Sequence, residues 1–159
     1  MTKSFSAIKS MIRIADAADV PDIFDVRTSV RDNHMTIEDL AEEGITPDAL
    51  PGMLDGSGRG WVAEVDGRVV AFAMVDADEA TVFALFVRPE LEGQGLGKIL
   101  LEVAEGWLVE QGLREIWLVT DKDLTVRANG FYRHLGWRDD GIQADGQVRF
   151  IKSCSGIHF

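Results

Sequence analysis

The sequence predicts a mixed α/β fold, in which helices cover a layer of strands. Segments with strand-like and helix-like periodicity follow one another in the order strand, helices, three strands, helix, strand, helix, strand. The strongest of these strands, residues 81–87, passes through a glycine-rich loop straight into an amphipathic helix that begins at Leu96. A chain of 159 residues with 46% hydrophobic composition fills one core, so we expect a single domain over residues 11–159 behind a flexible leader of residues 1–10.

The N-terminal part predicts one strand followed by helices. Residues 11–14 are apolar and partly β-branched, which favours a strand. Asp19 is expected to cap the next helix through its carboxylate, and Pro21 fits the first helical turn. The apolar stripe of this helix is Ile23, Val26 and Val30. Residues 36–43 predict a second short helix, which a glycine ends.

A broken helical segment and a hairpin come next. Thr46, followed by proline, is expected to begin another helix as its N-cap. The glycine-rich residues 56–60 are expected to form a flexible connection. They lead into two β-rich runs, residues 61–65 and 68–75, which Asp66-Gly67 joins in the way typical of a tight hairpin.

The C-terminal half predicts the strands and helices around the glycine loop. Residues 81–87 are apolar on both alternating faces, which predicts a central strand covered on both sides. The helix after the loop ends near Gly112, and its expected stripe is Leu96, Leu100, Val103 and Trp107. The remaining segments, in chain order, are a strand at 115–120, a helix at 125–135 closed by Gly136, a turn at 137–141, and a strand at 147–151 after an Asp145-Gly146 turn.

The composition of the chain argues against several classes of binding partner. The formal net charge of -11 opposes a general affinity for nucleic acid or an anionic membrane. Cys154 is the only cysteine, so we expect neither a disulfide framework nor a thiol-rich metal site, and no metal. The sequence has no apolar run of membrane-spanning length and no signal-peptide core, which favours a reduced, cytoplasmic setting.

The glycine loop predicts an anion site. Glycines at alternate positions let successive backbone N–H groups point into one concavity, and the positive end of a helix dipole lies behind them. A Walker loop fails here, because Glu92 replaces its first glycine and Ile99 its serine or threonine. The dinucleotide fingerprint also fails, because Lys98 replaces its third glycine.

A second group of residues, taken together with the loop, resembles a known protein family. Phe131-Tyr132 and Gly136-Trp137 follow the loop by about thirty to forty residues, and with it they resemble the GCN5-related N-acetyltransferase (GNAT) family. The resemblance is most specific between Leu85 and Trp137. It implies the GNAT fold, a mixed and mostly antiparallel central sheet of six to seven strands flanked by about four helices, and acetyl-CoA as cosubstrate. Glu92 departs from the arginine or glutamine of the family's loop, which weakens one side-chain contact and leaves the backbone cradle intact.

The resemblance also implies roles for individual residues. The coenzyme A pyrophosphate would be held by Gly93, Gln94, Gly95, Leu96, Gly97 and Lys98, mainly through backbone N–H groups, and Glu92 is counted with them as a coenzyme-binding residue. The strand end, Leu85, Phe86 and Val87, would splay from its neighbour and pair with the pantetheine arm, with the N–H of Val87 facing the thioester carbonyl. Tyr132, beside Phe131, would protonate or hydrogen-bond the leaving thiolate. Thr125 stands where the family often has asparagine, and Asn129 is a second candidate for a coenzyme contact.

The acceptor side is less defined by sequence. By resemblance, residues 27–34 and the segment through Met53 overhang it, and Arg27, Arg31 and His34 are candidate acceptor contacts. The two arginines would suit a carboxylate on an amino acid or peptide, whereas an acid-lined pocket would indicate a polyamine or aminoglycoside. We assign no general base; Glu64, Glu79, Asp121 or His34 would have to act through water.

These observations favour an acetyl-CoA-dependent N-acetyltransferase that transfers an acetyl group directly to a primary amine of a small molecule or peptide. The alternative is a non-catalytic domain of the same fold that binds or senses acyl-CoA, since a fold does not determine a function. A weaker third possibility is a protein-interaction module without coenzyme. The chain is expected to be a monomer or a homodimer.

Overall fold

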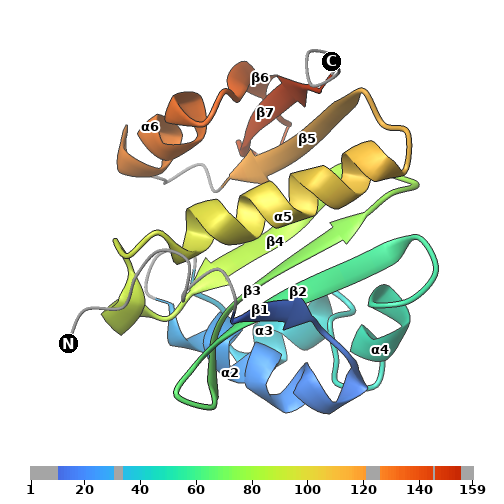
Figure 1. Cartoon of the computed structure of the whole chain (residues 1–159), viewed down its shortest axis with the longest axis vertical. Coiled ribbons are helices and arrows are strands. Elements are labelled where there is room, and N and C mark those ends of the chain that lie inside the picture. Colours follow the sequence, from blue (N-terminus) through green and yellow to red (C-terminus); the bar gives the residue numbers. More distant parts are fainter. Residues whose placement is uncertain (1–10, 31–33, 121–125, 145, 155–159) are drawn as a thin grey trace.

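The computed structural model describes residues 11–30, 34–120, 126–144 and 146–154, with the backbone alone for 126–129. They form a seven-stranded sheet in the order β1-β2-β3-β4-β5-β7-β6 (Figure 1). The strands are β1 (Ile12–Ile14), β2 (Gly58–Val65), β3 (Arg68–Asp76), β4 (Thr81–Val87), β5 (Glu115–Thr120), β6 (Arg138–Ile142) and β7 (Val148–Ser153). Neighbouring strands run antiparallel except β4 and β5, which are parallel. The mostly antiparallel sheet expected from the family resemblance is therefore confirmed.

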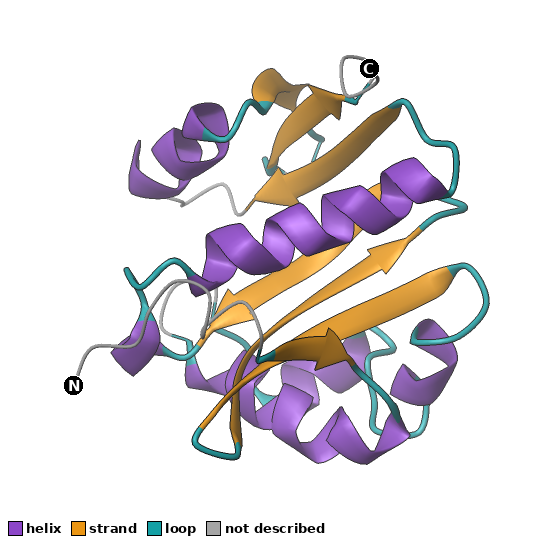
Figure 2. Ribbon diagram, in the orientation of Figure 1, coloured by secondary structure: helices purple, strands orange, loops and turns teal. Residues whose placement is uncertain are grey.

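Helices cover both faces of this sheet. They are η1 (Ala17–Asp19), α2 (Val20–Ser29), α3 (Ile37–Glu42), α4 (Leu50–Met53), η2 (Pro89–Leu91), α5 (Leu96–Glu110) and α6 (Val126–His134). Figure 2 shows α5 lying along one face of the sheet. The buried side chains of α5 include Leu100, Leu101 and Leu108, which belong to the core cluster on this face. A second core cluster joins Ile23, Phe24 and Val26 of α2 to Leu40, Leu50 and the opposite face of β2 and β3.

Local sequence signals account for several of these elements. Asp66 and Gly67 both have positive φ, 54° and 78°, as the predicted hairpin turn between β2 and β3 requires. Gly44 and Gly136 follow the ends of α3 and α6 with φ of 82° and 94°. Thr36 accepts a hydrogen bond from the N–H of Asp39 and so begins α3. The buried stripe of α5 is broader than predicted, since Ile99, Leu101, Ala104 and Leu108 are buried while Val103 and Trp107 are only half-buried.

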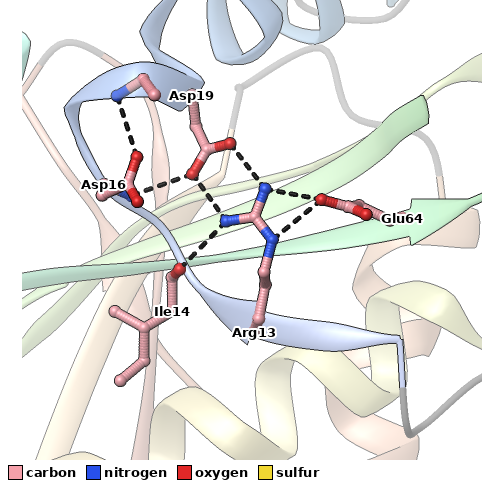
Figure 3. Close-up of polar contacts among 6 residues, drawn as sticks. Arg13, Ile14, Asp16, Asp19 and Glu64 are labelled. Carbon is pink, nitrogen blue, oxygen red and sulfur yellow. Dashed lines mark hydrogen bonds and ion pairs between the residues drawn. The ribbon is translucent and has the colours of Figure 1, made fainter. Parts of the chain in front are cut away.

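The expected cap of α2 is wrong in its chemistry. Asp19 occupies the N-cap position but makes no side-chain cap bond. Its carboxylate instead accepts two hydrogen bonds of 2.8 Å from Arg13 and one of 2.9 Å from the N–H of Asp16 (Figure 3). Arg13 also donates to Glu64 at 2.6 and 2.8 Å, so this cluster ties β1, β2 and the start of α2 together.

The glycine-rich residues 56–60 were expected to form only a flexible connection, but part of this segment is a strand. Gly58 and Gly60 belong to β2, where they pair with Asp76 and Met74. A Cβ on Gly58 would lie 2.1 Å from the carbonyl oxygen of Met53, and a Cβ on Gly60 would lie 2.7 Å from a methyl carbon of Leu54. Glycine is required because the end of α4 packs directly on this strand.

Of two other expectations, one holds in part and one is wrong. The hydroxyl of Thr46 accepts a hydrogen bond from the N–H of Ala49, as expected of an N-cap, but a turn follows and the helix begins only at Leu50. Residues 138–142 form β6 rather than a simple turn. All five residues of β6 are exposed, so the strand lacks apolar alternation and depends on its pairing with β7. Asp145 of the predicted turn before β7 lies outside the described residues.

Candidate active site

The site begins where two central strands separate. β4 and β5 pair only at Thr81 and Trp117, so beyond that point the two strands diverge. A β-bulge accompanies the divergence, because Val82 pairs with Val75 and Ala84 with Met74, leaving Phe83 as the extra residue. The splayed strand end implied by the family resemblance is therefore present.

The open edge of β4 presents backbone polar groups. The N–H of Arg88 donates to the carbonyl oxygen of Val70 on β3 at 2.9 Å. Successive residues of an extended strand point their backbone groups to opposite sides, so the N–H and C=O of Val87 and Leu85 face away from β3. They face the side from which β5 has withdrawn, where a ligand can pair with them as an added strand would.

The predicted covering of β4 on both sides is wrong. Thr81 and Val82 are buried, but residues 84–87 are only half-buried and Phe83 is 45% exposed. Their apolar side chains line a cavity of about 610 Å³ instead of a closed core. An apolar strand that borders a binding cavity has the same sequence pattern as one buried in protein.

The glycine loop forms the second wall of this cavity. Gly93 and Gly95 have φ of 81° and 85°, and Gly95 is the N-cap of α5 without a side-chain cap bond. The first intrahelical hydrogen bond runs from Ile99 to the carbonyl oxygen of Gly95, so the first-turn N–H groups before it have no acceptor within the helix. With the helix dipole, this end is suited to an anion.

Tyr132 and its neighbours form the third wall. The ring of Tyr132 lies 5.1 Å from that of Phe131, 6.2 Å from that of Trp137 and 5.5 Å from that of Phe150. Burial raises the pKa of Tyr132 to about 12, so its hydroxyl keeps its proton at neutral pH. A Cβ added to Gly97 would lie 3.8 Å from Phe131, so the helix start and α6 approach each other closely.

The cavity brings together most of the residues expected from sequence. Those that line it are Arg27, Leu85, Phe86, Val87, Glu92, Gly93, Gly95, Leu96, Gly97, Lys98, Phe131 and Tyr132. Gln94 and His34 are exposed and are not among its lining residues. Arg31 and Thr125 lie outside the described residues, as does the side chain of Asn129.

The far end of the cavity has an apolar wall that sequence patterns did not predict as part of a site, since they indicated only a core stripe for Ile23 and Val30. It is lined by Ile23, Phe24, Val30, Met35, Leu40, Ile45, Leu50, Met53, Phe72 and Met74. These side chains come from α2, α3, α4, the segments between these helices and β3. Only their packing shows that they share a surface, although the family resemblance pointed to the segment through Met53.

Arg27 lies in this wall and is 8% exposed. Its guanidinium carbon lies 4.3 Å from the centroid of the Phe86 ring, within cation–π distance. Burial lowers the pKa of Arg27, and the charge of Glu43, which also lines the cavity, opposes that shift.

The candidate bases lie elsewhere. Glu64 is engaged by Arg13 on the first strands, and Glu79 is an exposed residue of the turn before β4. His34 contacts the carbonyl oxygen of Val30 at 3.0 Å, and Asp121 is outside the described residues. Within the described part of the chain, no group of three or more His, Cys, Asp or Glu is placed to hold a metal, and no helix is both long and apolar enough to cross a membrane.

Comparison with known proteins identifies similar chains. A model of the Acetyltransferase (GNAT) family matches residues 22–137. The ribosomal protein bS18-alanine N-acetyltransferase of Escherichia coli (strain K12) is 34% identical over 80 residues, which are 49% of this chain and 53% of that relative. The chain thus spans about half the length of this curated relative.

Solved structures share the architecture. The PaiA N-acetyltransferase of Thermoplasma acidophilum in complex with coenzyme A superposes with a TM-score of 0.76 at 18% identity, over 89% of this chain and 97% of that one. A GNAT superfamily phosphinothricin acetyltransferase of Sinorhizobium meliloti in complex with acetyl-CoA gives 0.70 at 21% identity, over 89% and 86%. These likenesses confirm the predicted fold.

Proposed function

The chain belongs to the GNAT acetyltransferase family, and from this membership we propose that it transfers an acetyl group from acetyl-CoA to a primary amine of a small molecule or peptide. The observation that carries the proposal is the meeting of three features at one cavity: the uncapped start of α5, the open edge of β4, and the hydroxyl-bearing Tyr132. Coenzyme A and acetyl-CoA in the two similar structures support the choice of cosubstrate.

The residues present fit this cosubstrate. The first-turn N–H groups of α5, the glycine conformations at 93 and 95, and Lys98 at the rim would hold the pyrophosphate. The outward N–H and C=O groups of Leu85 and Val87 would pair with the amides of the pantetheine arm. Phe131, against Gly97, would enclose the arm from the side of α6.

Acetyl-CoA supplies an acyl group activated as a thioester. The N–H of Val87 would donate to the carbonyl oxygen as negative charge develops on it, in a site that the side chains of β4 and α6 keep apolar. The amine attacks only after its ammonium loses one proton to solvent. The new N–C bond then forms as the C–S bond breaks, and a second proton from the nitrogen ends on the departing sulfur.

Tyr132 would stabilise the departing sulfur chiefly as a hydrogen-bond donor. Its pKa of about 12 lies above the reference value of about 8.5 for a thiol, so full proton transfer to the thiolate is unfavourable. A short hydrogen bond to the charged sulfur does not require that transfer. The second proton therefore reaches the sulfur by way of water or the acceptor amine itself.

Thiol release with acetyl-CoA and a panel of primary amines tests the proposal. We expect turnover, and we expect Tyr132→Phe to lower kcat by roughly 10²-fold. The affinity for coenzyme A, measured by calorimetry, should change less than about twofold, because in this proposal the hydroxyl would contact only the sulfur. Tight coenzyme binding without turnover of any amine would instead support the non-catalytic acyl-CoA-binding domain.

A further inference from the structure

The acceptor end of the cavity combines an apolar wall with two opposite charges. Among the described lining residues, Arg27 and Glu43 carry the charge at this end, while Glu92 and Lys98 belong to the glycine loop at the other. Three half-buried aliphatic or thioether side chains, from the segments around α3 and α4, line the same cavity: Met35, Ile45 and Met53. Flexible methionines accommodate unbranched or branched apolar groups of varied shape.

The position of Arg27 indicates what the charge recognises. The residue is buried and its guanidinium lies over Phe86, next in sequence to Val87 on the open edge of β4. A planar guanidinium held on an aromatic ring binds a carboxylate in a fixed orientation through two parallel hydrogen bonds. Because the guanidinium is buried, a carboxylate bound there gains more than it would at an exposed arginine, although the charge of Glu43 opposes part of that gain.

We propose that the acceptor is a free α-amino acid with an aliphatic or thioether side chain, whose carboxylate binds Arg27 and whose side chain fills the wall around Met35, Ile45 and Met53. This inference rests on the proposed acetyl transfer and specifies its substrate class. In an α-amino acid the amine is two bonds from the carboxylate carbon. Binding of the carboxylate at Arg27 therefore brings the amino nitrogen of the acceptor beside β4. The negative charge of Glu43 favours initial binding of that amino group in its ammonium form.

A peptide acceptor fits this arrangement less well. The first residue of a peptide has an amide where a free amino acid has its carboxylate, so the buried guanidinium would face a neutral group. A polyamine would place further positive charge against Arg27. Both alternatives are distinguishable from an amino acid with matched compounds that share one side chain.

The experiment compares L-leucine with L-leucinamide and with a peptide that begins with leucine, using the full chain, acetyl-CoA and thiol release. We expect kcat/KM for leucine to exceed that for leucinamide by roughly 10- to 100-fold, the range for one charge-assisted interaction. L-Methionine should resemble leucine, and L-glutamate should be a poor acceptor. Equal or better turnover of leucinamide or of the peptide would overturn the inference while leaving acetyl transfer intact.

An Arg27 variant tests whether this residue causes the preference for leucine over leucinamide. Arg27→Met keeps an apolar side chain against Phe86 and should reduce the preference for leucine over leucinamide to less than about threefold. Arg114→Met, an exposed arginine outside the cavity, is the matched control and should keep the full preference. A preference that survives Arg27→Met, in a protein whose melting temperature shows it to be folded, would remove Arg27 from the proposal.

Binding provides a readout that needs neither turnover nor a variant. With coenzyme A present, N-acetyl-L-leucine should bind the unmodified protein at least about 10-fold more tightly than N-acetyl-L-leucinamide. If no amine is acetylated but this preference is found, the transfer proposal fails and the site assignment stands. If both compounds bind equally, the assignment of the carboxylate to Arg27 is wrong.

Discussion

Replacing Asp19 with asparagine tests whether charge, rather than shape, holds the N-terminal strand to the sheet and helices. The carboxylate is 6% exposed, accepts two hydrogen bonds of 2.8 Å from Arg13, and accepts a third from the backbone N–H of Asp16 (Figure 3). These hydrogen bonds lower the pKa of Asp19. Asp19→Asn keeps the side-chain volume and removes the negative charge.

We expect a loss of about 2 kcal/mol in the free energy of unfolding at pH 7. Hydrogen bonds to charged groups contribute roughly 1.5–3 kcal/mol, and the 43% exposure of Arg13 places this pair toward the lower end. Arg13 also keeps its contacts with Glu64, so its charge does not become unpaired. For a chain of this length the loss corresponds to roughly 4–8 °C in Tm.

The pH dependence separates charge from packing. The folded pKa of Asp19 lies below its unfolded value, so its contribution is complete above the unfolded pKa and disappears as pH falls through the folded pKa. Urea unfolding of both proteins should therefore differ at pH 7 and converge from about pH 5 downward. Asp22→Asn, an exposed change on the same helix, is the control. A loss equal to that of the control, or one independent of pH, would refute the argument.

Two further changes probe the coenzyme loop and the support of α6. Glu92→Gln removes a negative charge from the glycine-loop end of the cavity, where we propose that the coenzyme pyrophosphate binds, and should tighten coenzyme A binding roughly two- to fivefold at low salt. Glu110→Gln, at the opposite end of α5, should leave this affinity unchanged, and calorimetry showing equal effects of the two changes would contradict the prediction. Lys152 donates to Glu105 at 2.6 Å and to the carbonyl oxygen of Leu135 at 2.9 Å, so Lys152→Met should cost about 3 kcal/mol in urea unfolding, with part recovered when Glu105→Met is added. Strictly additive losses would show that the two side chains do not interact.

The elements that sequence predicted best have signals within their own residues. β4 and β5 coincide with the predicted ranges because each is a short apolar run bounded by turn residues. The start of α5 was equally clear, since glycines give way there to a helical apolar stripe. The same local chemistry indicated an anion site at the loop before any fold was known.

What sequence could not predict depends on contacts between distant segments. β6 is exposed throughout and is a strand only because β7 offers it a partner. The sequence around Gly58 and Gly60 resembles a flexible linker. Each position nevertheless requires glycine, because the backbone or a side chain at the end of α4 packs against it. The apolar wall at the far end of the cavity is likewise assembled from several short helices. Each helix taken alone has an apolar pattern that is typical of core residues.

Arg88 connects the two halves of the candidate site. Its guanidinium is 6% exposed and donates to Asp25 of α2 at 2.6 Å and to the carbonyl oxygen of Val69 at 3.1 Å. The end of β4 is thereby tied to α2 and β3 immediately after Val87. This tie fixes the end of β4 relative to α2 and β3. Because Arg27 lies two residues after Asp25 on α2, the helix that Arg88 ties to the end of β4 also carries the guanidinium that we propose binds the acceptor's carboxylate.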